Sequence, residues 1–281
     1  MYYSNPVYVF WTGGYDSTFR ICQLLIRYKT AVQPVYIADK YIDNHKEKGT
    51  RRQNHINEKN SREDIIAALH RKFPHTKKLL KKTMIVKNAN YDAEVIAAMK
   101  ELKRKKYVRR EKCQYGAMAQ VSKNLDKHIE VCAEVGGFIH KKLRTKLKCY
   151  AKTGCEYRDY TFTADGQGTA DGQGTGLGIF NRFVMPIIGY NKEDMYNEAV
   201  EYNYEDILNL TWSCWYPRKG KPCGKCIMCR ERYNPIEHFI SGNDHDHDHG
   251  NGHGHGHAIV IVIVIVIVIA IAIAINMPLL S

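Results

Sequence analysis

The amino-terminal stretch from Met1 to Trp11 lacks the three marks of a secretory signal: a basic region, an apolar core and a small-residue cleavage site. We therefore expect a cytoplasmic protein. In a reducing compartment, the nine cysteines, an odd number, predict metal ligation rather than disulfides. A hydrophobic content of 44% and a charged fraction of 25% exclude disorder throughout the chain and a multi-pass membrane protein.

Acidic residues are few beside basic ones, 29 against 42. The basic excess is concentrated between Lys77 and Lys152, most densely from Lys100 to Lys112. Such an excess attracts ATP, carboxylate substrates and nucleic acid. For the run from Lys103 to Lys106 we favour a plainer interpretation, the solvated face and end of a helix. Binding of tRNA and a homodimer both stay open, and tRNA is not favoured.

Strand-like runs alternate with segments of helical periodicity up to residue 210. Strands are expected at 7–11, 35–38, 84–86, 129–132, 183–188 and 207–210. Helices are expected from Ser17 to Tyr28, after a cap formed by Ser61 with Asp64, around Val95 to Leu102, and from Asn191. This alternation predicts an α/β fold, a doubly wound, mostly parallel sheet with helices on both faces.

Low-complexity segments set the limits of the predicted domain. We expect one α/β domain at 1–241, which includes a cysteine-rich segment at 211–232. Near 163–176 the six-residue sequence Ala-Asp-Gly-Gln-Gly-Thr occurs twice in succession, which indicates an insertion in a surface loop. Residues 242–281 form a tail of histidine repeats followed by alternating isoleucine and valine or alanine.

The apolar part of the tail, Ala258 to Ile275, is 18 residues long. As a helix it would span roughly 27 Å, just short of a bilayer core of about 30 Å. Alternating β-branched residues are poor helix formers, and the run favours self-association. A repeat-derived tail is the favoured interpretation, so a membrane partner is not expected, while an anchor and a docked extra strand stay open.

A glycine turn joins the first predicted strand to the first helix. At such a junction, backbone N–H groups and the helix dipole attract phosphate oxygens, and glycines let the backbone approach the anion. The predicted ATP-binding residues are Thr12, Gly13, Gly14, Tyr15, Asp16, Ser17 and Thr18. No Walker A loop is present, because no Gly-Lys-Ser/Thr follows a glycine at the required spacing. The alternative is a plain turn in which Asp16 or Ser17 caps the helix.

Four cysteines near the end of the predicted domain have the spacing of a metal site. They are Cys214, Cys223, Cys226 and Cys229, a Cys-x8-Cys-x2-Cys-x2-Cys pattern. Four thiolates around one tetrahedral Zn²⁺ is the expected arrangement, a closed structural site with no open coordination position. An iron–sulfur cluster is the alternative.

The turn and the cysteine segment together resemble one family. Thr12-Gly-Gly-Tyr-Asp-Ser-Thr18 has the Gly-Gly-x-Asp-Ser mark of PP-loop proteins. Thr211-Trp-Ser-Cys214 and Pro222-Cys-Gly-Lys-Cys-Ile-Met-Cys-Arg230, preceded by Met185-Pro-Ile-Ile-Gly-Tyr-Asn-Lys-Glu193, are similar to the 7-cyano-7-deazaguanine synthase family. The middle of the chain departs from it, with Ala38-Asp-Lys-Tyr-Ile-Asp43 where the family has Tyr-Gly-Gln.

The resemblance implies an ATP-dependent carbon–nitrogen ligase of PP-loop fold. Its substrates would be ammonia and the deazapurine 7-carboxy-7-deazaguanine. The carboxylate would attack ATP, ammonia would convert the activated acid to an amide, and further activation with loss of water would give the nitrile. Mg²⁺ would share the charge of the phosphates, and Asp16 would contact it or cap the helix. No general base is predicted, so the catalytic residues are unknown at this point.

Three other functions stay open, the last of them a membrane-tethered interaction protein defined by its apolar tail. A PP-loop ATPase that modifies tRNA would use the basic segment Lys100 to Lys112. Against thiolation, no pairing of catalytic cysteines is evident among Cys113, Cys132, Cys149 and Cys155. The second is a non-catalytic, zinc-containing nucleic-acid-binding protein, which would lack affinity for ATP.

Overall fold

Five parallel strands form the centre of the structure, a computed structural model that describes residues 5–38, 54–87, 90–108, 113–135, 147–150, 159–162, 176–230 and 232. In spatial order they are β3 (Met84–Lys87), β2 (Val32–Ala38), β1 (Val7–Phe10), β4 (Ile129–Glu130) and β7 (Phe183–Val184). Two antiparallel strands extend the β7 edge, β6 (Asp159–Phe162) and β5 (Leu147–Tyr150). The prediction of a doubly wound, mostly parallel sheet is confirmed.

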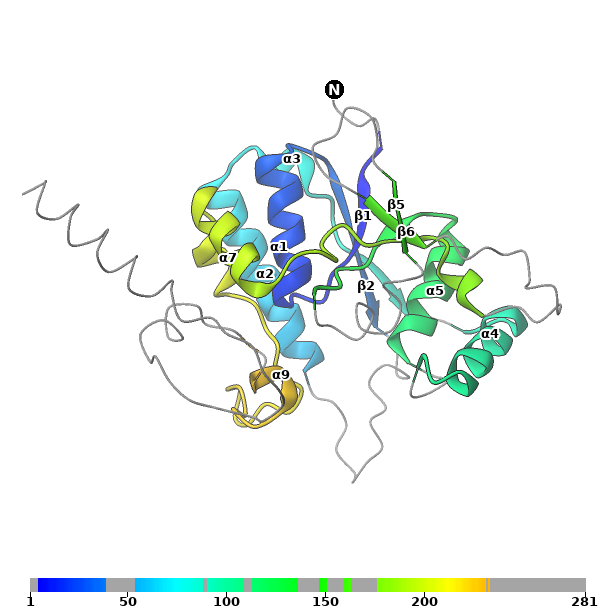
Figure 1. The fold of residues 1–281 in the computed structure, drawn as a ribbon. Helices are drawn as coiled ribbons and strands as arrows, with labels where there is room; N and C mark the ends of the chain where they lie inside the picture. The colour runs from blue at the N-terminus through cyan, green and yellow to red at the C-terminus, as the bar shows by residue number, and fades with distance from the viewer. Residues whose placement is uncertain are drawn as a thin grey trace, which may run out of the picture. The chain divides into compact units, whose positions relative to one another are not determined.

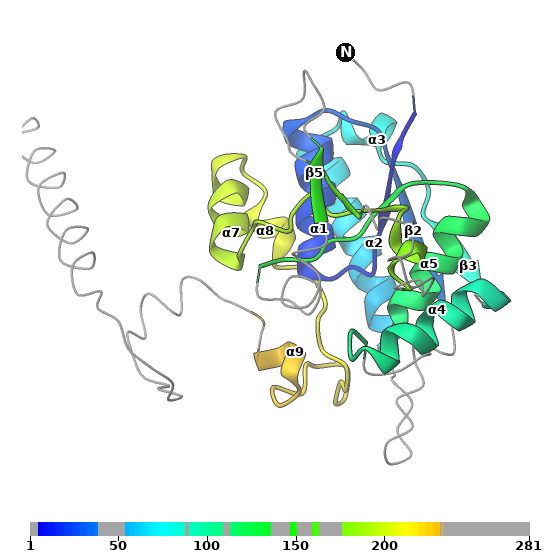
Figure 2. The ribbon, with the colours of Figure 1, turned by 45° about the vertical axis from the view of Figure 1, so that its right-hand side comes forward.

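Helices cover both faces of this sheet (Figures 1 and 2). On one side lie α1 (Tyr15–Cys22), which continues as the π-helix η1 (Gln23–Arg27), with α2 (His55–Lys72), α3 (Thr76–Leu79), α7 (Lys192–Glu201) and α8 (Glu205–Leu208). On the other lie α4 (Ala93–Arg104), α5 (Gln114–Leu125) and the 3₁₀ helix η3 (Leu177–Phe180). The short helix α9 (Ile227–Arg230) belongs to the cysteine segment.

The central strand β1 shows why both faces are covered. Because successive side chains of a strand point to opposite faces, Val9 joins the α1 side of the core while Phe10 joins the α4 side. Both are buried, at 0% and 5% exposure. A strand that is apolar on both faces needs a layer of helices on each, as the sequence pattern predicted.

The helix predicted to start at Asn191 is confirmed by its cap. The Asn191 side chain accepts a hydrogen bond from the backbone N–H of Asp194, and the Asp194 side chain accepts one from the N–H of Asn191. This reciprocal capping box satisfies two N–H groups that a helix leaves unpaired. It fixes where α7 begins, and therefore places Lys192 in its first turn.

The predicted cap at Ser61 is wrong. Helix α2 begins at His55, so Ser61 and Asp64 lie inside it. The Ser61 hydroxyl instead donates to the carbonyl oxygens of Leu210, at 2.8 Å, and Gly13, at 3.3 Å. A residue typical of helix caps here connects α2 to two other segments.

Other expectations need correction. The stretch predicted as a strand at 207–210 falls in helix α8 and the turn after it, because so short an apolar run does not distinguish the two structures. The strand expected at 183–188 is only Phe183–Val184, since Pro186 follows closely, and the strand expected at 129–132 ends at Glu130. Helix α5 and strands β5 and β6 were not predicted.

The predicted tail, residues 242–281, lies outside the described residues, as does the insertion up to residue 175. Within the described part of the chain, no helix combines the length and the apolar character needed to cross a membrane.

Candidate active site

The glycine turn after β1 has a backbone that only glycine adopts easily. Gly13 has a φ of +87°, and a Cβ atom there would lie 3.1 Å from the carbonyl oxygen of Glu58. The Gly13 carbonyl accepts a hydrogen bond of 2.9 Å from the backbone N–H of Trp212, two residues before Cys214. The turn is thus attached directly to the start of the cysteine segment.

Helix α1 begins at this turn without a side-chain cap. Its N-cap is Gly14, and the Ser17 hydroxyl donates to the Gly14 carbonyl at 3.3 Å rather than accepting from the first turn. The alternative in which Asp16 or Ser17 caps the helix is therefore wrong. The backbone N–H groups of Tyr15, Asp16 and Ser17 have no partner within the helix, which leaves them to attract an anion.

A cavity of about 230 Å³ opens beside this turn. It lies at the carboxyl ends of β1 and β4, which are neighbours in the sheet although β1 is followed in sequence by β2 on its other side. This is the topological switch point, where ligands bind in doubly wound folds. The cavity is lined by Phe10, Thr12, Gly14, Tyr15, Asp16, Ser17, Gln114, Tyr115, Met118, Val131, Cys132, Ala133, Glu134, Lys192, Trp212, Ser213, Met228 and Arg232.

Most of the predicted ATP-binding residues lie on this cavity. Thr12, Gly14, Tyr15, Asp16 and Ser17 line its wall, while Gly13 and Thr18 are not among the lining residues. Thr18 is fully buried, and its hydroxyl accepts a hydrogen bond of 3.0 Å from the indole Nε1–H of Trp11. The Thr18 side chain thus holds the turn against the core.

Three charged side chains meet in the cavity. The ammonium of Lys192 forms an ion pair with the carboxylate of Asp16 and a second, at 2.7 Å, with that of Glu134. Burial disfavours the charged form of Lys192, but these two carboxylates outweigh it and raise the pKa of Lys192 above its ordinary value. The ammonium also lies 5.3 Å from the centre of the Tyr15 ring. Lys192 is therefore a cation held beside the glycine turn.

The four predicted metal ligands lie together. The sulfur atoms of Cys214, Cys223, Cys226 and Cys229 are all within 4.8 Å of one another. Around a tetrahedral zinc with bonds of about 2.3 Å, neighbouring sulfurs are separated by about 3.8 Å. The Sγ atoms of Cys223 and Cys229 are 3.9 Å apart. The residues present fit one zinc ion.

Backbone N–H groups prepare one of these thiols for a metal. The N–H of Cys226 donates to the Sγ of Cys223 at 3.3 Å, and the glycine between these cysteines, Gly224, has a φ of +66° that turns the chain back. Hydrogen bonds from the N–H groups of Lys225 and Cys226 lower the pKa of Cys223 to about 6. The lowered pKa favours the thiolate, the form that binds a metal.

Several lining residues were missed from the sequence. Lys192 carried a usable signal, because it follows the recognisable cap Asn191 and so had to begin a helix. Gln114, Tyr115 and Met118 belong to the unpredicted helix α5, and Arg232 follows the last cysteine. Nothing local in the sequence indicates that these residues face the glycine turn.

Fold and site together define a class: a doubly wound α/β protein with a cavity at the switch point and a four-cysteine cluster of metal-binding geometry beside it. Residues 177–239 match the family described as Queuosine biosynthesis protein QueC. The 7-cyano-7-deazaguanine synthase of Prochlorococcus marinus strain MIT 9215 is 39% identical over 59 residues, 21% of this chain and 25% of that enzyme. Its counterpart in strain MIT 9515 is 49% identical over 47 residues, 17% of this chain and 20% of that enzyme.

The resemblance to the 7-cyano-7-deazaguanine synthase family is confirmed, over a short part of the chain. The chain spans about a quarter of the length of the curated relatives it matches. The matched stretch contains all four cysteines and the cavity residues Lys192, Trp212 and Arg232.

Proposed function

We propose that this protein is an ATP-dependent carbon–nitrogen ligase that converts 7-carboxy-7-deazaguanine and ammonia to 7-cyano-7-deazaguanine. One observation supports the proposal above all. The cavity unites the glycine turn with residues of the stretch 177–239, which matches the family described as Queuosine biosynthesis protein QueC. Its wall thus combines a turn suited to hold an anion with a part of the chain that resembles a queuosine-biosynthesis family.

The phosphates of ATP would lie at the turn. There the first N–H groups of α1 are donors, and the Lys192 ammonium is the neighbouring cation. The Ser17 hydroxyl would donate to a phosphate in place of its 3.3 Å bond to the Gly14 carbonyl. Asp16 alone would repel a phosphate, but its ion pair with Lys192 removes that difficulty. These groups would stabilise the negative charge that grows on the departing pyrophosphate when the substrate carboxylate attacks ATP.

Magnesium would have its ligands among the acidic residues of the cavity. Carboxylate oxygens are the ligands that Mg²⁺ prefers, and Asp16 and Glu134 both line the wall. When bound, the ion would share the charge of the phosphates with Lys192. Zinc, in contrast, would be enclosed by four thiols and would act on the architecture alone.

The test supplies purified protein with magnesium-ATP, ammonia and 7-carboxy-7-deazaguanine, and follows the base by mass spectrometry. The nitrile should form. Asp16→Asn and Ser17→Ala should lower turnover by roughly 10² or more, the usual effect of losing an electrostatic contact made in the transition state. Asp206→Asn is the matched control, because Asp206 is an exposed acid paired with Lys72 outside the cavity.

Each outcome has a distinct meaning. ATP binding without consumption of the acid would show that the substrate is a different one. Absence of any affinity for magnesium-ATP would favour the non-catalytic nucleic-acid-binding protein. Unchanged ATP affinity and turnover in Ser17→Ala would remove the glycine turn from the mechanism.

A further inference from the structure

A buried polar network lies behind the cavity. Arg20 of α1 binds Glu130 of β4 through two hydrogen bonds, from Nε at 2.8 Å and from Nη2 at 2.7 Å. These side chains are only 1% and 5% exposed. The third nitrogen of the guanidinium, Nη1, donates to the side-chain oxygen of Gln23 at 2.6 Å. This fork of hydrogen bonds fixes α1 and η1 against the end of β4.

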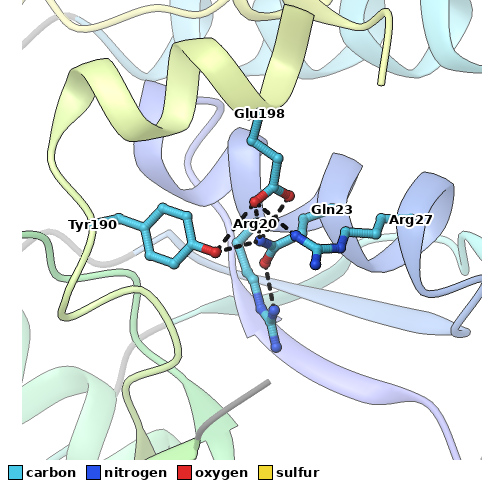
Figure 3. Close-up of polar contacts among 5 residues, drawn as sticks. All are labelled: Arg20, Gln23, Arg27, Tyr190 and Glu198. Atoms are coloured by element: carbon cyan, nitrogen blue, oxygen red, sulfur yellow. Dashed lines mark hydrogen bonds and ion pairs between the residues drawn. The ribbon is translucent and has the colours of Figure 1, made fainter. Parts of the chain in front are cut away.

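The network continues from Gln23 to helix α7 (Figure 3). The Gln23 amide donates to the two carboxylate oxygens of Glu198 at 2.8 and 3.0 Å. Glu198 also accepts from the Tyr190 hydroxyl at 3.2 Å and from the Arg27 guanidinium at 3.1 Å. Gln23 and Arg27, which both bind Glu198, are the first and last residues of the π-helix η1. In this turn the Tyr28 N–H donates to the Gln23 carbonyl, and π-helical turns are frequent at functional sites.

Stability alone is a poor explanation for this arrangement. Taking charges such as those of Arg20 and Glu130 out of water costs several kcal/mol per ion, and well-packed apolar residues in their place are often equally stable. Hydrogen bonds of fixed direction, in contrast, specify one relative position of the elements they join. The network therefore suggests a need for accurate placement.

The three segments joined here carry Asp16, Glu134 and Lys192, the ion-paired charges of the cavity. Asp16 lies one turn before Arg20 on α1, Glu134 follows Glu130 after β4, and Lys192 begins the helix that holds Glu198. Each of these three charged groups thus has a member of the network on its own segment, four to six residues away in sequence.

We propose that Gln23 and Glu198 are positioning residues, which hold α7 on α1 so that the Lys192 ammonium lies between the carboxylates of Asp16 and Glu134. This inference rests on the proposed function, since it gives that cation its task of receiving a phosphate. A displacement of about 1 Å at such a group can lower a rate by roughly 10². Supporting residues must therefore hold it to within about 0.5 Å.

The test is a double-mutant cycle. Glu198→Ala removes the acceptors and should lower kcat by about 10-fold or more, with a smaller change in the KM for the deazapurine acid. Glu198→Gln keeps an oxygen for the Gln23 amide and should restore most of the activity. In a Lys192→Ala background, Glu198→Ala should have almost no further effect on kcat, because a positioning residue acts through the group it positions. Glu201→Ala, an exposed acid on the same helix, is the matched control.

Two results would overturn the inference. One is an equal loss of kcat in both backgrounds, and the other is a lower Tm in Glu198→Ala with kcat unchanged. A crystal structure of Glu198→Ala is the readout that does not depend on activity, and Lys192 should have left Glu134. If the wild-type protein showed no ATP-dependent turnover, the proposed function would fail, and the position of Lys192 in that structure would still decide whether Glu198 places it.

Discussion

Removal of the metal from the four-cysteine site should destabilise the protein and open its cavity. Between residues 215 and 230, none of the side chains that the structure describes is fully buried. The described side chains of this segment form no apolar core of their own, so we expect a metal to supply much of the free energy that folds it. Met228 and Arg232, which lie in or just after the segment, form part of the cavity wall and should be displaced with it.

The size of the effect follows from linkage. An ion that binds only the folded state at 100 times its Kd stabilises that state by about 2.7 kcal/mol. In a domain of this size, 1 kcal/mol shifts Tm by about 2–4 °C, so chelation should lower Tm by about 5–11 °C. The affinity for magnesium-ATP or for the deazapurine acid should fall as well, because the wall is lost.

The assay combines metal analysis, calorimetry and ligand titration on protein with and without chelator. One zinc per chain is expected, and Cys226→Ser should lower metal content and Tm together. Cys113→Ser is the control, a cysteine outside the cluster that should leave the metal content unchanged. Complete removal of the metal with an unchanged Tm would refute the reasoning, and iron with a visible absorption band would replace zinc by the iron–sulfur alternative.

Three further variants test stability. Asp92→Ala should cost about 1 kcal/mol, because its carboxylate caps α4 by accepting from the Val95 N–H at 2.9 Å. Hydrogen bonds from Lys123 and from that N–H lower the pKa of Asp92, so its contribution is present above its ordinary pKa and should disappear in urea titrations as pH falls through the lowered value. Deletion of residues 163–175 should leave Tm nearly unchanged. Gly176→Ala should cost about 1–2 kcal/mol or more, because φ is +70° and a Cβ atom would lie 2.7 Å from the Ala98 carbonyl oxygen; equal melting of these two variants would contradict the expectation.

Local patterns in the sequence were sufficient to predict the central strands and helices of the fold. The run Val7 to Phe10 is apolar on both faces, and helical periodicity follows directly, so the strand, the turn and the helix could be predicted in order. The cysteine cluster could be predicted for the same reason, since three of its ligands lie within seven residues and Gly224 turns the chain between them.

Helix α5 gave almost no signal, because the side it buries is made of small and polar residues. Gly116, Ala117, Ala119, Gln120 and Ser122 are among its buried positions, so no stripe of large apolar residues appears. Gly116 is also unfavourable within a helix, yet a Cβ atom there would lie only 3.1 Å from the Tyr91 ring. Close packing explains this glycine, and sequence periodicity does not reveal it.

The charges of the cavity could not be paired from the sequence. Asp16 and Lys192 are separated by 176 positions, and their contact depends on how α1 and α7 pack. From the sequence, two roles were expected for Asp16: contact with magnesium or capping of α1. The ion pair with Lys192 is a third, and the choice among them is made by tertiary structure.

The basic run at the end of α4 gives a last prediction, which separates a ligase for a free base from an enzyme that modifies tRNA. Arg104 binds Glu101 through two hydrogen bonds of 2.7 and 2.8 Å, and Lys105 pairs with the same carboxylate at 3.2 Å. Part of the positive charge is thus already compensated, and no residue of the run Lys103 to Lys106 lines the cavity.

Charge reversal at Lys103 and Lys106 should therefore leave turnover of the deazapurine acid unchanged within about twofold, since exposed charges outside a site contribute little to it. The wild-type protein should also lack steep salt-dependent binding of tRNA. A true interface with 6–10 phosphate contacts would lose roughly 10³–10⁵ in affinity between 50 and 200 mM salt. Filter binding over this range decides the matter: a slope of that size, flattened by the two reversals, would show that the run binds RNA, and the assignment of a free base as substrate would then have to be given up.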